Sequence, residues 1–459
     1  MNEIEAKCRA KGLKWVGGEG PLDAKIVIVG KALESEEERL GHLFRGGAGY
    51  LLDNVLTRTH ISRGDVYLTN VVKIRPPKND LKLLSSLGLS VSEFIPTLKE
   101  ELLRVKPNVC VALGETALSA LTSLKAIMSW RGSIVESKLV EGLKVIPSIH
   151  PADILRNYKW KPLLIIDMRR VKDESLTREI KLPQRNFIIE PSFSDVRNTL
   201  DLIDKTGWKV ACDIETDKMG LISCLSFSSN PSWAISIPFR NGYRNYWTEG
   251  EEYVVWKMLR DFFQSGKGWV YQNALFDMKF LVPKVGYHEC YMDTMWAHQL
   301  CYAEIPKGLD TLCSIYTREP YYKDERKVWK DISITKQLWL YNAKDSAVTL
   351  EVAIGLEKEL REHKLEDFFF GYVMKLLPVL LKLELRGMKI SADSRNSMER
   401  ELRTKNELLA KEIGVNVNSP KQLAQFLYGE LGLPKQFHHK KGTLTTNKEA
   451  LIKIRTKMR

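Results

Sequence analysis

The chain has 459 residues, too many for a single hydrophobic core, so two to four domains are expected. Hydrophobic residues make up 44% and charged residues 28%, and no apolar run approaches the ~20 residues of a membrane-spanning helix. A net charge of +13 favours a polyanionic partner such as nucleic acid, although a merely basic surface would give the same charge.

The cysteines and the amino terminus favour the cytoplasm. The seven cysteines are an odd number and form no CxxC pair, so they are expected to be reduced and mostly buried thiols. The first residues, Met1–Glu5, are polar and lack the basic and apolar regions of a signal peptide. We therefore expect a cytoplasmic protein without a membrane partner.

The first 165 residues alternate short β-rich runs with helical stretches, which is the pattern of a parallel α/β domain. Each run ends near a glycine, a proline or a polar residue, where sites in such sheets usually lie. Residues 166–185 are dense in charge and contain Pro183, so they are predicted to be an interdomain linker. The β-rich runs cover residues 25–29, 66–71, 109–113 and 143–147.

A second α/β unit is predicted over residues 186–356, with its first clear strand at Trp208. Residues 357–459 show a helical, amphipathic pattern, with a kink expected at Pro378 and a break at Gly387. The fold class is therefore multidomain α/β with a helical carboxy-terminal region.

Three short acidic motifs follow one another in the second unit. In the first, Asp213 and Glu215 lie two residues apart in a predicted strand, so their side chains point to the same side. In the other two, polar residues four apart share one face of a predicted helix. These pairs are Asn273 with Asp277 and Tyr341 with Asp345. The convergent carboxylates suit two hard divalent cations, Mg²⁺ or Mn²⁺, which take oxygen ligands and clamp a phosphodiester from both sides.

Together the motifs resemble the proofreading 3′–5′ exonuclease domain of family A DNA polymerases, in the subclass with tyrosine in its third motif. The resemblance covers residues 186–356 and extends to the stretches 290–295 and 308–312. It implies a ribonuclease H-like α/β domain with an active site, because every acidic position is intact; the alternative is an inactive domain of the same fold.

The resemblance also implies roles for individual residues. Tyr341 would orient the attacking water, and Asn273 would lie beside the terminal nucleotide. The residues that would hold two Mg²⁺ or Mn²⁺ ions are Asp213, Glu215, Asp277 and Asp345.

Ribonuclease D-like exoribonucleases share these motifs and are the main alternative. The following residues favour the polymerase family, because 376–390 resemble the helix that enters its polymerase domain and 416–423 resemble its thumb motif, with 445–451 continuing the pattern. Ser419 and Pro420 suit the start of a helix. Lys421, Lys440 and Lys441 are expected to contact DNA. Lys440 and Lys441 lie in a predicted polar loop, for which a plain solvated loop is the alternative.

No palm or fingers motif follows the partial thumb, so this chain alone is not expected to polymerise DNA. It would be either a truncated chain or one subunit of a split polymerase whose second polypeptide carries the fingers and palm. The expected DNA partner is a single-stranded 3′ end or a primer-template, in a bacterial cell or a virus-infected host. The alternatives are a free-standing 3′–5′ exonuclease of repair or RNA processing and a non-catalytic DNA-binding assembly subunit.

Residues 20–160 resemble the uracil-DNA glycosylase superfamily, especially its iron–sulfur type. The matching stretches are 41–49, 67–77, 106–114, 131–132 and 149–153. The resemblance implies that Phe44 stacks on a flipped base, that Asn70 hydrogen-bonds its edge and that His150 stabilises the departing base anion. An ordinary buried histidine is the alternative for His150.

Two departures from this family argue against base excision. Lys31 stands where the family has an acidic or amide residue that positions water. Ile74 and Phe94 replace two of the cluster cysteines, and Cys8 has no nearby partner in the sequence. Because such a cluster needs four ligands, we expect no iron–sulfur cluster and a degenerate, DNA-binding or interaction domain.

Overall fold

The computed structural model describes residues 2–323, 335–437 and 443–458, so the predicted DNA contacts Lys440 and Lys441 lie outside the described residues. The chain divides into two compact units, Met1–Leu385 and Arg386–Arg459. Among the described helices, none is long and apolar enough to cross a membrane.

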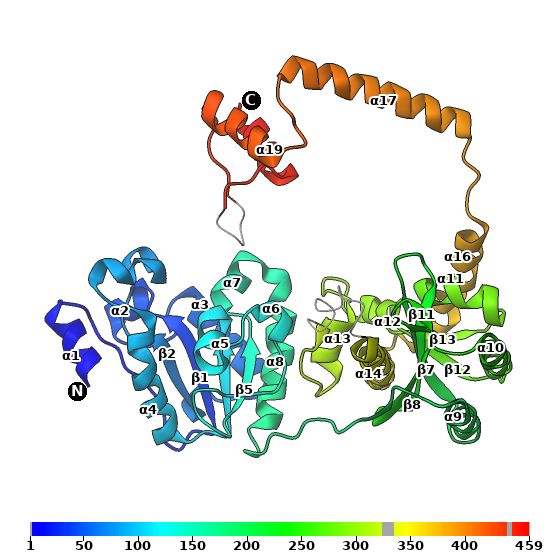
Figure 1. Cartoon of the computed structure of the whole chain (residues 1–459). Helices are drawn as coiled ribbons and strands as arrows, with labels where there is room; N and C mark the ends of the chain where they lie inside the picture. The colour runs from blue at the N-terminus through cyan, green and yellow to red at the C-terminus, as the bar shows by residue number, and fades with distance from the viewer. Residues whose placement is uncertain (1, 324–334, 438–442, 459) are drawn as a thin grey trace. The chain divides into compact units, whose positions relative to one another are not determined.

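The first sheet has five strands in the order β2-β1-β3-β5-β4, and all pairs except β4 with β5 are parallel (Figure 1). The four predicted runs are all strands. Their bounds are β1 (Ile26–Ala32), β2 (Val66–Val72), β3 (Val109–Leu113), β4 (Val135–Glu136) and β5 (Lys144–Ser148).

Side chains of β1 alternate between two cores, because successive residues of a strand point to opposite faces. Ile26 and Ile28 enter the core that contains α3 and α8, whereas Val27 and Val29 enter the core that contains α1, α4 and α5. The domain is therefore a three-layer α/β sandwich, as predicted. The helices are α1 (Glu3–Ala10), α2 (Ser35–Leu40), α3 (Gly47–Arg58), α4 (Ile95–Val105), α5 (Gly114–Thr122), α6 (Ile127–Trp130), α7 (Pro151–Arg156) and α8 (Lys161–Glu174).

The predicted linker at 166–185 is shorter in the structure. Residues up to Glu174 belong to α8, because Met168 and Val171 are fully buried in the first domain while charged residues such as Asp173 face solvent. A strand, β6 (Asn186–Ile188), also precedes the strand predicted at Trp208.

The second sheet has six strands in the order β13-β12-β7-β8-β9-β6. Strands β7, β8 and β9 are antiparallel neighbours, and β12 and β13 continue the sheet in parallel. The remaining strands and the helices of this domain are β7 (Lys209–Thr216), β8 (Ile222–Asn230), β9 (Trp233–Pro238), β12 (Gly268–Tyr271), β13 (Cys290–Asp293), α9 (Phe193–Thr206), α10 (Glu249–Phe263), α11 (Ala274–Val285), α12 (Thr294–Cys301), α13 (Leu309–Tyr316) and α14 (Thr335–Glu362).

Helix α14 packs against β7, β8 and β9 and continues past the boundary predicted at residue 356. It continues because Leu356 and Leu360 are fully buried in the core of the second domain. After the short helix α15 (Glu366–Phe368), helix α16 (Met374–Arg386) buries Met374, Leu377 and Leu381 in the same core. It ends at the predicted break, where Gly387 has a left-handed φ of +65°.

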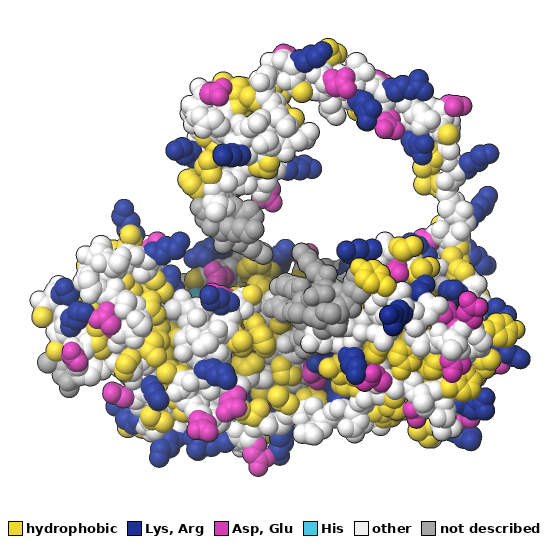
Figure 2. All heavy atoms as spheres, in the orientation of Figure 1, with side chains coloured by type: hydrophobic (Ala, Val, Ile, Leu, Met, Phe, Trp, Pro, Cys, Tyr) yellow, Lys and Arg dark blue, Asp and Glu magenta, His cyan; other side chains and the backbone are white. Residues whose placement is uncertain are grey.

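The second unit is helical, with α17 (Ala392–Ile413), α18 (Pro420–Ala424) and α19 (Lys448–Met458). Ser419 caps α18 by accepting a hydrogen bond from the Gln422 amide, and Pro420 occupies the first turn, as predicted. Lys421 is exposed. Figure 2 shows lysine and arginine side chains scattered among other residue types rather than gathered in one patch.

A buried ion pair of the first domain, Arg131 with Asp167, also contacts the second domain. The Arg131 guanidinium contacts both oxygens of Asp167, and its third nitrogen donates to Ser314 Oγ at 2.9 Å. Arg131 is 2% exposed and Asp167 is 0% exposed. Removing one partner of such a pair leaves an uncompensated buried charge, so the pair stabilises the first domain, and the Arg131–Ser314 hydrogen bond extends it to the second.

Asp167→Ala should lower the free energy of unfolding by about 3–5 kcal/mol, because Arg131 would stay buried without its counter-ion. Asp173→Ala removes the same side chain from an exposed position of the same helix and should change stability by less than about 0.5 kcal/mol. Denaturant or thermal unfolding of both variants checks this. Equal midpoints would show that the ion pair does not stabilise the folded chain.

Candidate active site

The three acidic motifs line one cavity of about 600 Å³ in the second domain. Strand β7 contributes the first motif, the start of α11 the second and α14 the third. The structure therefore brings together all six residues that the sequence predicts for the exonuclease site, namely Asp213, Glu215, Asn273, Asp277, Tyr341 and Asp345.

Three of the predicted metal ligands lie close enough to share one cation. Asp213, Glu215 and Asp345 each offer a carboxylate oxygen, and these atoms lie within 4.8 Å of one another. The period of two along β7 places the first two on one side, and α14, which packs against β7, brings Asp345 to them. Asp277 is 3% exposed and accepts a hydrogen bond from the Ile214 amide at 3.0 Å. That bond ties α11 to β7 at the site.

Asn342 holds Asp213 and is a residue that the sequence reasoning missed. Its Nδ2 donates to Asp213 Oδ2 at 2.8 Å, and its Oδ1 accepts from Ser236 Oγ at 2.9 Å. Asn342 is fully buried, so its amide holds the Asp213 carboxylate from the protein interior. Its place directly after Tyr341 in the third motif was the available signal.

The second motif differs from the predicted helical pairing. Asn273 is not in the helix: it precedes α11 with a left-handed φ of +71°. Asp293, fully buried at the end of β13, accepts hydrogen bonds from the amides of Asn273 at 3.2 Å and Ala274 at 2.8 Å. Burial raises the pKa of Asp293 to about 6, while these amide contacts oppose the rise. Its role in shaping the motif was also missed.

Two further residues, Tyr322 and Lys323, contact the third motif. Tyr322 Oη donates to Asp345 Oδ1 at 2.6 Å. Lys323 Nζ donates to Asp345 Oδ2 at 2.5 Å and to Tyr341 Oη at 2.7 Å. Neither belongs to a motif singled out in the sequence.

The carboxylates repel one another strongly. Burial raises the pKa of Asp213 well above its usual value, and the charges of Asp345, Asp277 and Glu215 raise it further, in that order. Lys323 opposes this rise. A cavity that gathers carboxylates and penalises their charge is chemically suited to a multivalent cation.

The predicted pocket residues of the first domain also lie together. A Cβ on Gly30 would lie 2.2 Å from Asn70 Oδ1 and 2.8 Å from Phe44 Cζ, so glycine is required there. The rings of Phe44 and His150 are 6.4 Å apart between centroids. Desolvation lowers the pKa of His150 to about 4, so it is neutral near pH 7. Within the described residues, Asn70 Nδ2 is buried and has no hydrogen-bond partner.

Lys31 lines a second cavity of about 330 Å³ together with His150 and Arg156. Its Nζ donates to the Asn79 carbonyl at 3.1 Å. Lysine thus stands where the resemblance implies a water-positioning group, while the acidic residues Glu34, Glu115 and Asp153 line the same cavity.

Cys8 lies in an apolar core and not in a cluster of thiols. It is fully buried with Ile74 and Phe94, and Trp15 stacks on Phe94 with ring centroids 5.9 Å apart. The only other cysteine of the first 165 residues is Cys110 on β3. An iron–sulfur cluster requires four ligands, and the apolar residues around Cys8 do not fit such a cluster.

Both domains match known families. Residues 18–169 match the uracil DNA glycosylase superfamily, and residues 194–361 match a 3′–5′ exonuclease family. A type-4 uracil-DNA glycosylase of Thermotoga maritima is 41% identical over 181 residues, which cover 38% of this chain and 91% of that protein.

DNA polymerases match the chain over a small part of their own length. The DNA polymerase of Bacillus phage SP01 is 29% identical over 213 residues, covering 45% of this chain and 22% of that protein. DNA polymerase I of Helicobacter pylori is 38% identical over 84 residues, covering 17% of this chain and 9% of that protein.

The two domains define a protein of DNA processing, with a glycosylase fold followed by a 3′–5′ exonuclease domain. Through its first domain the chain belongs to the uracil-DNA glycosylase superfamily, and its exonuclease domain is of the family found in family A polymerases. The predicted families and the predicted fold class are confirmed.

Asp213→Asn should raise the thermal midpoint of the metal-free protein at pH 8, because it removes a buried charge from the carboxylate cluster. The folded wild type holds the Asp213 proton more tightly than the unfolded chain does. Its stability therefore falls as the pH rises from the unfolded pKa of about 3.9 toward the raised folded pKa. The advantage of the variant should vanish near pH 4. Asp201→Asn, at an exposed position of α9, is the control and should show no such gap.

Proposed function

We propose that the chain is a metal-dependent 3′–5′ DNA exonuclease that proofreads for a family A DNA polymerase. The observation that carries this proposal is the convergence of Asp213, Glu215 and Asp345 oxygens within 4.8 Å of one another, in a cavity that Asp277 and Tyr341 also line. The oxygen-only donor set fits hard divalent cations such as Mg²⁺ or Mn²⁺.

The residues of the cavity would divide the work as follows. Asp213, Glu215, Asp277 and Asp345 would hold two ions, which when bound supply an activated water and stabilise the leaving 3′ oxygen. Tyr341 orients the attacking water through its phenol. Asn342 keeps the Asp213 carboxylate in position through the 2.8 Å hydrogen bond.

Asn273 contacts the terminal nucleotide, since its left-handed backbone turns it into the mouth of the cavity. The partner is a DNA 3′ end, in single-stranded or primer-template form, and Lys421 binds its backbone, as do Lys440 and Lys441. Fingers and palm on a second polypeptide or on a longer chain complete the polymerase, in the cytoplasm of a bacterial cell or a virus-infected host. The match to the SP01 DNA polymerase supports this assignment over a free-standing nuclease of RNA processing.

With 3′-labelled single-stranded DNA and RNA as parallel substrates, the wild type should release labelled mononucleotides from DNA with Mg²⁺ or Mn²⁺, and not with chelator. Asp213→Ala should lower the rate by more than about a hundredfold, since even changes behind a metal ligand cost roughly 10–100-fold. Asp201→Ala on the exposed face of α9 is the matched control and should retain full activity. Preference for RNA would favour the ribonuclease alternative, and no hydrolysis of either substrate would favour a purely binding role.

For the first domain, we propose DNA binding without base excision and without an iron–sulfur cluster. The unpartnered Asn70 amide beside Phe44 supports a pocket that still contacts a nucleobase. Lys31 in place of the water-positioning group, and the apolar surroundings of Cys8, support the loss of hydrolysis and of the cluster.

The wild type should produce no abasic sites in uracil-containing DNA, read out as alkali-labile strand breaks. Lys31→Glu restores a carboxylate and should give detectable excision, whereas Lys31→Ala should not. Strand breaks by the wild type at a rate comparable to a glycosylase control would contradict this proposal. An absorbance band near 400 nm in the purified protein would likewise contradict the absence of a cluster.

A further inference from the structure

A lysine ammonium lies against one of the carboxylates that would bind metal. Lys323 Nζ contacts Asp345 Oδ2 at 2.5 Å, while Tyr322 Oη occupies Oδ1 at 2.6 Å. The Lys323 side chain is 18% exposed and that of Asp345 is 6% exposed. The carboxylate that completes the metal triad is thus already engaged at both oxygens.

We propose that Lys323 is a positioning residue of the exonuclease site, which competes with a divalent cation for Asp345 and is released to the DNA phosphodiester when substrate arrives. The inference rests on the proposed exonuclease function. In this proposal the Lys323 ammonium occupies the place of a metal cation at Asp345, so that tight metal binding depends on DNA.

The competition follows from charge. A divalent cation coordinated by Asp345 would lie next to the ammonium on the same carboxylate, and in a partly buried cavity the two positive charges repel strongly. Lys323 Nζ also lies over the Tyr341 ring, 4.4 Å from its centroid, and this second contact holds the ammonium beside the site. Metal binding without DNA therefore has to displace or strain this contact.

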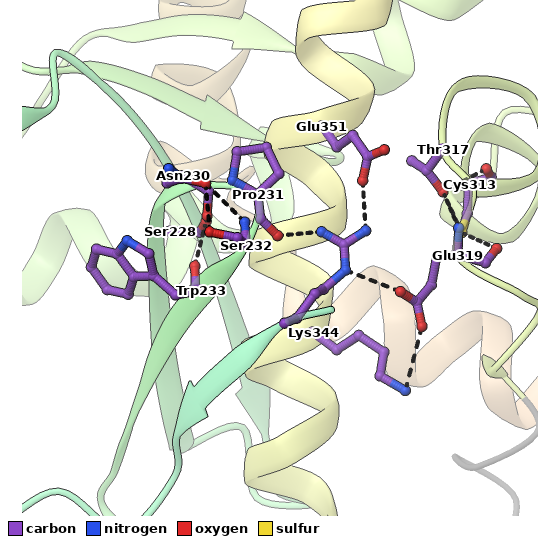
Figure 3. Close-up of polar contacts among 11 residues, drawn as sticks. Ser228, Asn230, Pro231, Ser232, Trp233, Cys313, Thr317, Glu319, Lys344 and Glu351 are labelled. Atoms are coloured by element: carbon purple, nitrogen blue, oxygen red, sulfur yellow. Dashed lines mark hydrogen bonds and ion pairs between the residues drawn. The ribbon is translucent and has the colours of Figure 1, made fainter. Parts of the chain in front are cut away.

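The backbone that precedes Lys323 is anchored to both domains. Figure 3 shows Glu319 close to Lys344 of α14, at 3.9 Å, and Arg185 contacts both Glu319 and Glu351 of the same helix. The Tyr321 amide donates to Ser133 Oγ of the first domain at 3.2 Å.

Because residues 319–321 are fixed in this way, the long Lys323 side chain is the part that has to move. When a metal ion binds Asp345, a phosphodiester in the cavity can replace this carboxylate as the negatively charged partner of Lys323.

Reciprocity extends the proposal to DNA. If DNA draws Lys323 away from Asp345, then DNA must tighten metal binding, and metal must tighten DNA binding by the same factor. A variant without the ammonium loses most of this coupling.

The test measures Mn²⁺ affinity by electron paramagnetic resonance in the full chain, with and without a single-stranded oligonucleotide whose 3′-terminal linkages are phosphorothioates. Without DNA, Lys323→Gln should bind Mn²⁺ about tenfold more tightly than the wild type, and the oligonucleotide should tighten wild-type binding and close that gap. Lys323→Arg keeps the charge and should behave as the wild type. Turnover on ordinary DNA should fall about tenfold in Lys323→Gln, with rescue by Lys323→Arg.

Lys358→Gln is the matched control, because this lysine lies on α14 like Asp345 but its side chain is 77% exposed and its ammonium lies 3.8 Å from Glu362. It should leave Mn²⁺ affinity within about twofold of the wild type. Unchanged or weaker Mn²⁺ binding in Lys323→Gln would overturn the inference, as would equal tightening in Lys358→Gln. Hydrolysis by the wild type is scored separately, so tight Mn²⁺ binding without hydrolysis would sink the proposed function and leave the competition measurable.

Discussion

The crowding of carboxylates where α14 crosses β7 is the constraint on which the second domain depends. Burial and like charge both raise the pKa of Asp213, so the folded chain has to compensate for a cluster that disfavours its own ionisation. It does so with hydrogen-bond donors of four kinds: the Asn342 amide, the Ile214 N–H, the Tyr322 hydroxyl and the Lys323 ammonium. These donors fix the oxygens in space before any cation binds, which is what preorganised catalysis requires.

One helix organises most of this compensation. Helix α14 carries the third motif on the face that packs on β7 and β8, where Ser346 and Ser226 hydroxyls meet at 2.5 Å. Farther along, its Glu351 receives Arg185, and its last turns bury Leu356 and Leu360. The same apolar packing that stabilises the domain therefore sets the height of Asp345 above Asp213. The geometry of the carboxylate site therefore depends on the packing of the core.

How far the sequence predicts the site follows from where each residue gets its position. Asp213 and Glu215 were predictable because a strand fixes their common face, and Tyr341 and Asp345 because a helix does. The position of Asn273 was not predictable from a helical period, because it depends on Asp293, which is distant in sequence and accepts a hydrogen bond from the Asn273 backbone amide. Lys323 and Tyr322 lie outside the three motifs, so only the tertiary path of the chain brings them to Asp345. Charge density alone predicts a linker from residue 166, but α8 continues to Glu174 because one face of this charged helix is buried.

The interface between the first two domains gives the glycosylase fold a structural role that does not require base excision. Arg131 reaches Ser314 at the end of α13, Arg170 donates to the Ile315 carbonyl, and Glu174 pairs with Arg318. All three contacts fall on the segment that leads to Tyr322 and Lys323. A surface of the first domain thereby supports the segment that supplies both donors to Asp345. The link between the two domains runs through Arg131, Arg170 and Glu174, which are not among the predicted pocket residues Phe44, Asn70 and His150.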